Sequence, residues 1–90
     1  MTDHDEILPY LRTLRDLIRW SANQMNATGL HFGHGTDNAI DEAAALVLHA
    51  LHLPPDLPAE YLQARLTPPE QQTALHLLQR RIAERKPAAY

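Results

Sequence analysis

Two pairs of histidines have a spacing that could bring imidazole side chains together. His31 and His34 lie three residues apart in a glycine-containing segment, and His49 and His52 repeat this spacing at the end of an apolar run. Two imidazoles three residues apart on a helix share a face and can bind a metal ion. No third and fourth ligand follows at a regular spacing. We therefore expect His49 and His52 to lie at a helix carboxyl end, where the dipole favours them, and keep a four-histidine metal site as an alternative.

The segment 31–38, His-Phe-Gly-His-Gly-Thr-Asp-Asn, is chemically the most particular part of the chain. Its two glycines allow a tight turn, and the polar residues after them can satisfy backbone donors at the start of a helix. A phosphate-binding loop would follow a strand and carry a lysine, and neither feature is present. Turn geometry does not require Phe32 or His34. The segment is predicted to serve an interaction surface or to pack between two helices.

Apolar periodicity predicts the helices on either side of this segment. The first helix is expected from about Asp5 to Ala27, beginning near Ile7 or Leu8 if Pro9 stands in its first turn. The glycine at position 29 is suited to the left-handed conformation that ends a helix. The second helix is expected over 39–52, with Asn38 as its N-cap.

The last third of the chain predicts two more helices. A short one is expected over 60–65. The next begins at Thr67-Pro68-Pro69-Glu70, which has the spacing of a capping box, and ends before Pro87. No alternating strand pattern is present. The fold class is therefore all-α, as a small bundle of four helices, or five if the first one breaks.

Composition limits the classes of function. Ninety residues form one small domain, and the absence of cysteine excludes disulfides and zinc–thiolate sites and favours a cytoplasmic location. No apolar stretch reaches membrane-spanning length. Residues 1–60 carry nine acidic and three basic side chains, a net charge of −6, whereas residues 61–90 carry +3. The acidic half argues against direct nucleic-acid binding and is compatible with a basic protein partner.

Several motifs occur together in an order and at a spacing typical of one enzyme family. The chain resembles the N-terminal region of the bacterial glutamine N5-methyltransferases that modify the third protein of the large ribosomal subunit, a family related to the release-factor methyltransferases. The resemblance runs from about Leu11 to Tyr90 and rests on Leu17-Ile18-Arg19-Trp20-Ser21, Gly33-His34-Gly35-Thr36-Asp37-Asn38, Asp41-Glu42-Ala43, Leu51-x-Leu53-Pro54 and Ala64-Arg65-Leu66-Thr67.

The resemblance implies a division of labour. The family binds S-adenosylmethionine through a glycine-rich loop in a Rossmann-like domain and holds the target glutamine with an Asn-Pro-Pro-Tyr motif, and this sequence contains neither. Residues 1–90 are thus expected to be a helical substrate-recognition domain that stops where the catalytic domain would begin. The expected partners are a basic ribosomal protein and the enzyme's own catalytic domain. No catalytic, cofactor-binding or metal-binding residue is assigned within the chain.

The resemblance also suggests which residues could face the substrate or the catalytic domain. As aromatic residues, Tyr61 and Trp20 could each anchor a partner, although an isolated aromatic residue on an amphipathic helix is more often part of the core. An apolar patch near Leu77, Ile82 and Tyr90 is expected, which would also favour dimers. A stand-alone helical adaptor is the alternative function. The candidate substrate-binding or interdomain residues are Trp20, Phe32, His34, Thr36, Asp37 and Asn38.

Overall fold

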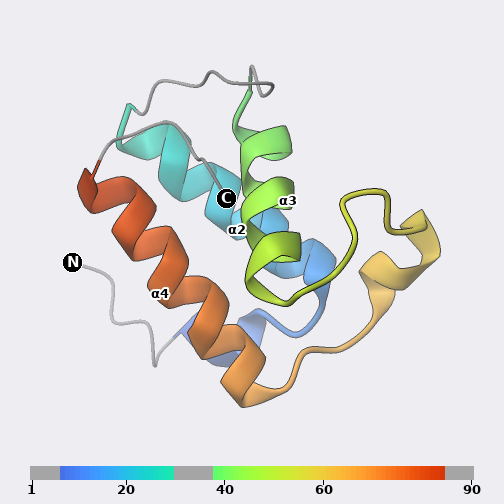
Figure 1. Ribbon diagram of the computed structural model, residues 1–90. Helices are drawn as coiled ribbons and strands as arrows, with labels where there is room; N and C mark the ends of the chain where they lie inside the picture. The colour runs from blue at the N-terminus through green and yellow to red at the C-terminus, as the bar shows by residue number, and fades with distance from the viewer. Residues whose placement is uncertain (1–6, 30–37, 85–90) are drawn as a thin grey trace.

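The computed structural model describes residues 7–29 and 38–84, and this part of the chain is all-helical. Figure 1 shows α2 lying behind α3, with α4 along their side. The all-α class is confirmed. A bundle of four to five α-helices is not confirmed, because the described residues form three α-helices and two 3-10 turns: η1 (Leu8–Tyr10), α2 (Leu14–Ala27), α3 (Ala39–Ala50), η2 (Ala59–Gln63) and α4 (Pro68–Glu84).

The predicted first helix is wrong over its amino-terminal part. Thr13 is extended (φ −119°, ψ 165°) and caps α2. Its hydroxyl accepts a hydrogen bond from the Asp16 backbone N–H at 3.1 Å, and its own N–H donates to the Asp16 carboxylate at 3.2 Å. This capping box starts a new helix, so the described residues upstream of it form the turn η1, and Tyr10 is 73% exposed.

Helix α3 ends two residues before its predicted end. The His52 N–H donates to the His49 carbonyl at 3.1 Å, and the Leu53 N–H donates to the Leu48 carbonyl at 2.8 Å. These two bonds form a Schellman motif, which places His52 in the left-handed region at φ 58°. Glycine normally occupies this position because a side chain there is strained. The predicted left-handed glycine, Gly29 at φ 68°, is confirmed.

Helix α4 begins where the sequence predicts. The Thr67 N–H donates to the Glu70 carboxylate at 2.8 Å, and the Glu70 N–H donates to the Thr67 hydroxyl at 3.3 Å. Pro68 occupies the first helical position, where its missing N–H has no intrahelical partner to lose. The short helix expected over 60–65 is instead the 3-10 turn η2, which follows Pro58.

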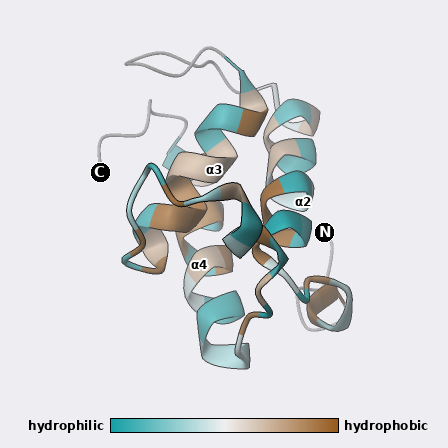
Figure 2. Cartoon of the chain, turned by 90° about the vertical axis from the view of Figure 1, so that its right-hand side faces the viewer, coloured by the Kyte–Doolittle hydropathy of each residue, from teal (hydrophilic) through white to brown (hydrophobic). Residues whose placement is uncertain are grey.

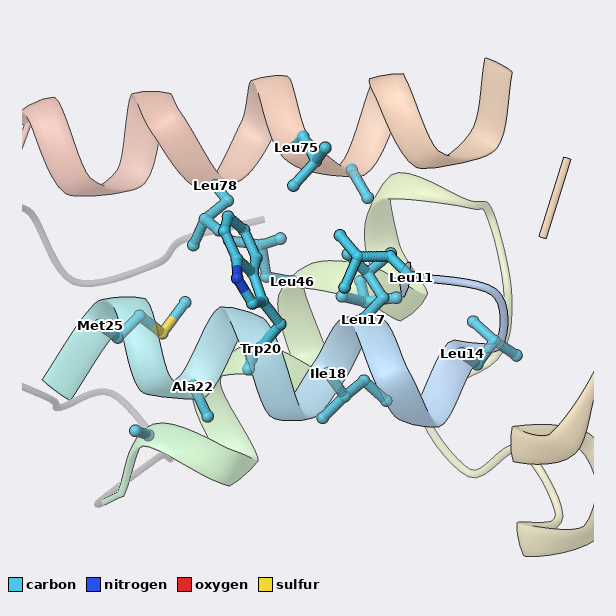
Figure 3. Packing of buried hydrophobic residues seen from close by; sticks show 14 residues of the cluster. Leu11, Leu14, Leu17, Ile18, Trp20, Ala22, Met25, Leu46, Leu75 and Leu78 are labelled. Carbon is cyan, nitrogen blue, oxygen red and sulfur yellow. The ribbon is translucent and has the colours of Figure 1, made fainter. Parts of the chain in front are cut away.

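The core lies where the three α-helices meet. Figure 2 shows hydrophilic and hydrophobic bands alternating along α2, as an amphipathic helix requires. Figure 3 shows the Trp20 indole pointing from α2 toward Leu78, with Leu46 beside it. None of the helices in the described part of the chain is both long enough and apolar enough to cross a bilayer. The buried apolar cluster comprises Leu11, Leu14, Leu17, Ile18, Trp20, Ala22, Met25, Ala39, Ala43, Leu46, Val47, Ala74, Leu75 and Leu78.

Polar bonds fasten the irregular segments to this core. An isolated antiparallel bridge joins Thr13 to Arg65, with the Leu66 N–H donating to the Arg12 carbonyl at 2.7 Å. The buried Gln71 side chain donates to the Leu8 carbonyl at 3.0 Å and also to the Leu11 carbonyl. The Leu8 carbonyl also accepts from the Leu11 N–H at 3.1 Å within η1, so the Gln71 amide adds a second donor there and gives the Leu11 carbonyl a donor from α4.

Candidate interaction surface

Three helix ends lie together at one end of the molecule. The carboxyl end of α2, the amino end of α3 and the carboxyl end of α4 are adjacent in Figure 1. Asn38 caps α3 there: its side-chain oxygen accepts a hydrogen bond from the Asp41 N–H at 2.8 Å, and its amide nitrogen donates to the Asp41 carboxylate at 3.0 Å. The predicted N-cap is confirmed. Its side chain is occupied locally, so Asn38 orients the start of α3.

Trp20, the second candidate within the described residues, lies in the core. Its side chain is 8% exposed. It packs in the cluster that joins α2 to α3 and α4. An indole buried in this way contributes mainly packing and area burial. Trp20 therefore supports the surface above it from inside the bundle and offers almost no area to a partner.

The other four candidates, Phe32, His34, Thr36 and Asp37, lie outside the described residues, so their roles stay predictions. The structure fixes the residues on either side of them, Gly29 and Asn38. The predicted contact surface thus begins and ends at the assembly of helix ends described above.

A buried ion pair at this end was not predicted. The Arg81 Nε lies 3.5 Å from the Glu42 carboxylate, and the two side chains are only 4% and 1% exposed. The start of a helix suits an acidic side chain and its end suits a cation, so neither position by itself requires burial. The structure instead places the pair inside the bundle, where it connects the first turn of α3 to the last turn of α4.

Exposed apolar side chains lie in the first turn of α3 and in the two 3-10 turns. Ile40 and Tyr61 are each 54% exposed. Tyr61 belongs to η2 and is exposed, although an isolated aromatic residue was expected in the core, so its role as an anchor stays a prediction. The apolar patch predicted near the end of α4 is not seen in the described residues, because Leu77 and Ile82 are half-buried against the core, and Tyr90 lies outside them.

Arginines line two grooves. One groove, of about 470 Å³, lies between η1 and the start of α4 and is lined by Arg12 and Arg65 with leucine and proline side chains. The other, of about 390 Å³, is lined by Arg15 and Arg19 of α2 together with Ile40. Both grooves combine apolar side chains with arginines, and the second groove also contains Asp16.

Charge on the described surface is more balanced than the sequence suggested. Glu42 is buried, and the exposed acidic residues within the described part of 1–60 are Asp41, Asp56 and Glu60. Three arginines of the same half, at positions 12, 15 and 19, are also exposed. The acidic excess that favoured a basic partner therefore lies largely in residues 1–6 and 30–37, outside the described part.

The histidine pair at the end of α3 meets a third histidine. His49, His52 and His76 line one groove of about 250 Å³ between α3 and α4, together with Arg80. Over residues 7–29 and 38–84, no three histidine, aspartate or glutamate side chains are arranged to hold a metal ion. The other two members of the four-histidine alternative, His31 and His34, lie outside these ranges. His76 was missed because it is 24 residues from the nearer member of the pair.

Comparison with known proteins finds relatives that are named as protein methyltransferases. The chain is 55% identical over 80 residues to the ribosomal protein uL3 glutamine methyltransferase of Bordetella pertussis, and 56% and 51% identical over the same length to the proteins of that name from Xylella fastidiosa and Neisseria meningitidis. The match covers 89% of this chain and 26–27% of these relatives. No family model and no solved structure matches the chain.

The resemblance inferred from sequence motifs is thereby confirmed. The chain is homologous to enzymes that methylate proteins. In particular, the relatives carry the name of ribosomal protein uL3 glutamine methyltransferases. The chain spans about a quarter of their length.

Proposed function

We propose that this chain is the substrate-recognition domain of an S-adenosylmethionine-dependent enzyme that methylates a glutamine side-chain amide of ribosomal protein uL3. The observation that carries the proposal is a sequence identity of 55–56% over 80 residues to relatives of that name. Because the match covers about a quarter of each relative, the methyl donor and the reacting amide are assigned to the remaining part. The reaction is assigned to the cytoplasm.

The contribution of this domain is binding and placement. The proposed contact residues are Phe32, His34, Thr36 and Asp37, which lie between α2 and α3 in the sequence. Support for this comes from the rigid frame around them: Asn38 caps α3, and the Glu42–Arg81 pair joins α3 to α4 at the same end. Segments that connect the helices of a packed scaffold are a common place for recognition residues.

The test measures steady-state methylation of purified uL3 by the enzyme that contains this chain, with variants His34→Ala and Asp37→Ala. Since the proposed contacts bind protein substrate and do not touch the reacting atoms, KM for uL3 should rise about tenfold while kcat changes less than about twofold. Asn23→Ala, an exposed change on α2, is the matched control and should leave both constants unchanged.

Two results would reject parts of this proposal. Normal KM values in folded His34 and Asp37 variants would remove the recognition role of the segment. A parent protein that transfers no methyl group to uL3 would remove the enzymatic assignment and leave the stand-alone helical adaptor, whose partner would then be sought by pull-down.

Light scattering on the purified chain tests dimer formation, for which the exposed Ile40 and Tyr61 provide apolar area.

A further inference from the structure

The groove between α3 and α4 contains a cluster of side chains that the proposed function does not use. His49 and His52 come from the carboxyl end of α3, and His76 and Arg80 come from α4. All four residues are exposed. Among the described residues that line this groove there is no carboxylate. The side chains nearest to a bound ligand would thus be three imidazoles and one guanidinium.

The backbone at His52 determines where its imidazole lies. Its φ of 58° is in the left-handed region, where glycine is the usual occupant. The Schellman motif at the end of α3 produces this conformation. This conformation places an imidazole at the edge of the groove, where glycine would leave only backbone.

The neighbouring charges determine what this groove can bind. Both histidines of α3 stand at the negative end of the helix dipole, which suits a positively charged side chain and by itself repels an anion. Glu84 lies 3.8 Å from Arg80 and partly neutralises it. The Thr73 hydroxyl, which also lines the groove, donates its hydrogen bond to the Pro69 carbonyl at 2.9 Å and so offers no donor to an anion. The attraction for an anion must therefore come mainly from protonated imidazoles.

The geometry points to a proton-dependent site for a small oxyanion, of the phosphate or sulfate class, held by His49, His52, His76 and Arg80. A protonated imidazole carries a positive charge and two N–H donors, so protonation strengthens the attraction of such a cluster for an anion. A groove of about 250 Å³ is large enough for one such oxyanion and a short part of the molecule that carries it. This inference does not depend on the proposed methyltransferase function.

The test is a sulfate titration of the purified chain followed by NMR at pH 5.5 and 7.5, at constant ionic strength. Sulfate is chosen because its own charge does not change over this range. We expect binding at pH 5.5 to be at least about tenfold tighter, since each imidazolium near the anion adds a favourable Coulomb interaction. The amide shifts should be confined to the end of α3 and the middle of α4.

Two variants and a control make the test specific. The triple change His49→Gln, His52→Asn and His76→Gln removes every titratable ring from the groove, and asparagine tolerates the left-handed backbone. It should reduce the affinity at pH 5.5 to the value at pH 7.5. Arg15→Gln removes one exposed positive charge outside this groove and should change the affinity less than about twofold.

Three outcomes would overturn the proposal. These are equal affinity at the two pH values, pH-dependent binding that survives in the triple variant, and shifts that map elsewhere on the molecule. A phosphodiester oligonucleotide that bound at the histidines while sulfate did not would also overturn it, because recognition would then belong to a nucleic-acid backbone. If sulfate binds as expected, inorganic phosphate and a phosphoserine peptide compared at pH 5.5 would identify the source of the oxyanion.

Discussion

The change Glu42→Gln should destabilise the domain strongly. The Arg81 Nε lies 3.5 Å from the Glu42 carboxylate in a site where both side chains are at least 96% buried. At this distance and an effective dielectric constant of about 20, the attraction is about 5 kcal/mol. Glutamine keeps the shape and removes the charge, so the buried Arg81 cation loses the attraction of the Glu42 carboxylate. Breaking one side of such a pair costs about 3–5 kcal/mol.

This cost is large compared with the stability of a domain of this size. A chain of 90 residues has an unfolding free energy of roughly 5–13 kcal/mol. Urea denaturation followed by the fluorescence of the single tryptophan, which is 8% exposed, measures the change directly. The melting temperature should fall by at least about 12 °C, since 1 kcal/mol shifts it by about 4–8 °C in a domain this small.

The surface provides a matched control. Arg80 and Glu84 also form an ion pair, at 3.8 Å, with side chains 72% and 50% exposed. Solvent screens this pair, so Glu84→Gln should cost less than about 0.5 kcal/mol. The double variant Glu42→Leu, Arg81→Met removes both buried charges and should be much more stable than Glu42→Gln alone. If Glu42→Gln cost no more than Glu84→Gln, the argument from buried charge would be refuted.

Three further changes test other parts of the structure by the same denaturation assay. Thr13→Ala removes the capping box of α2 and should cost about 1 kcal/mol, whereas Thr73→Ala, at an exposed position inside α4, should cost less; equal losses would contradict the capping role. Gln71→Leu leaves the Leu11 carbonyl without its buried side-chain donor, while the Leu8 carbonyl keeps the Leu11 N–H, and should cost about 1–3 kcal/mol; an unchanged urea midpoint would show that water replaces the amide. His52→Gly should raise stability by up to about 1 kcal/mol because it relieves a positive φ, and a loss would mean that the His52 side chain stabilises the fold.

Local signals predicted the helix boundaries that depend only on neighbouring residues. The Asn38 cap, the capping box at Thr67 and Glu70, and the left-handed Gly29 are all confirmed. Each of these features is made by hydrogen bonds or backbone preferences within a few residues. These features can therefore be predicted from the sequence without any knowledge of the tertiary structure.

The break in the first helix could also have been predicted. Thr13 and Asp16 have the spacing of a capping box, like Thr67 and Glu70. The signal was overlooked because apolar residues continue at helical spacing on both sides of it, from Ile7 to Met25. Periodicity identifies which face is buried, and it does not show whether one helix or two present that face.

The buried ion pair shows where prediction from this sequence ends. Arg81 follows Leu78 by three residues and Ala74 by seven, so helical register alone places it on the buried stripe of α4. Glu42 precedes Leu46 by four residues and has the same relation to the core of α3. Register can thus identify each residue as a buried charge that needs a partner. That the two meet depends on how far α4 extends past α3, which is set by packing across the core. The ion pair fixes the position of α4 relative to α3 at the end of the bundle where the predicted recognition segment joins α3. The orientation of the proposed site therefore depends on a contact between two residues that are 39 positions apart in the sequence.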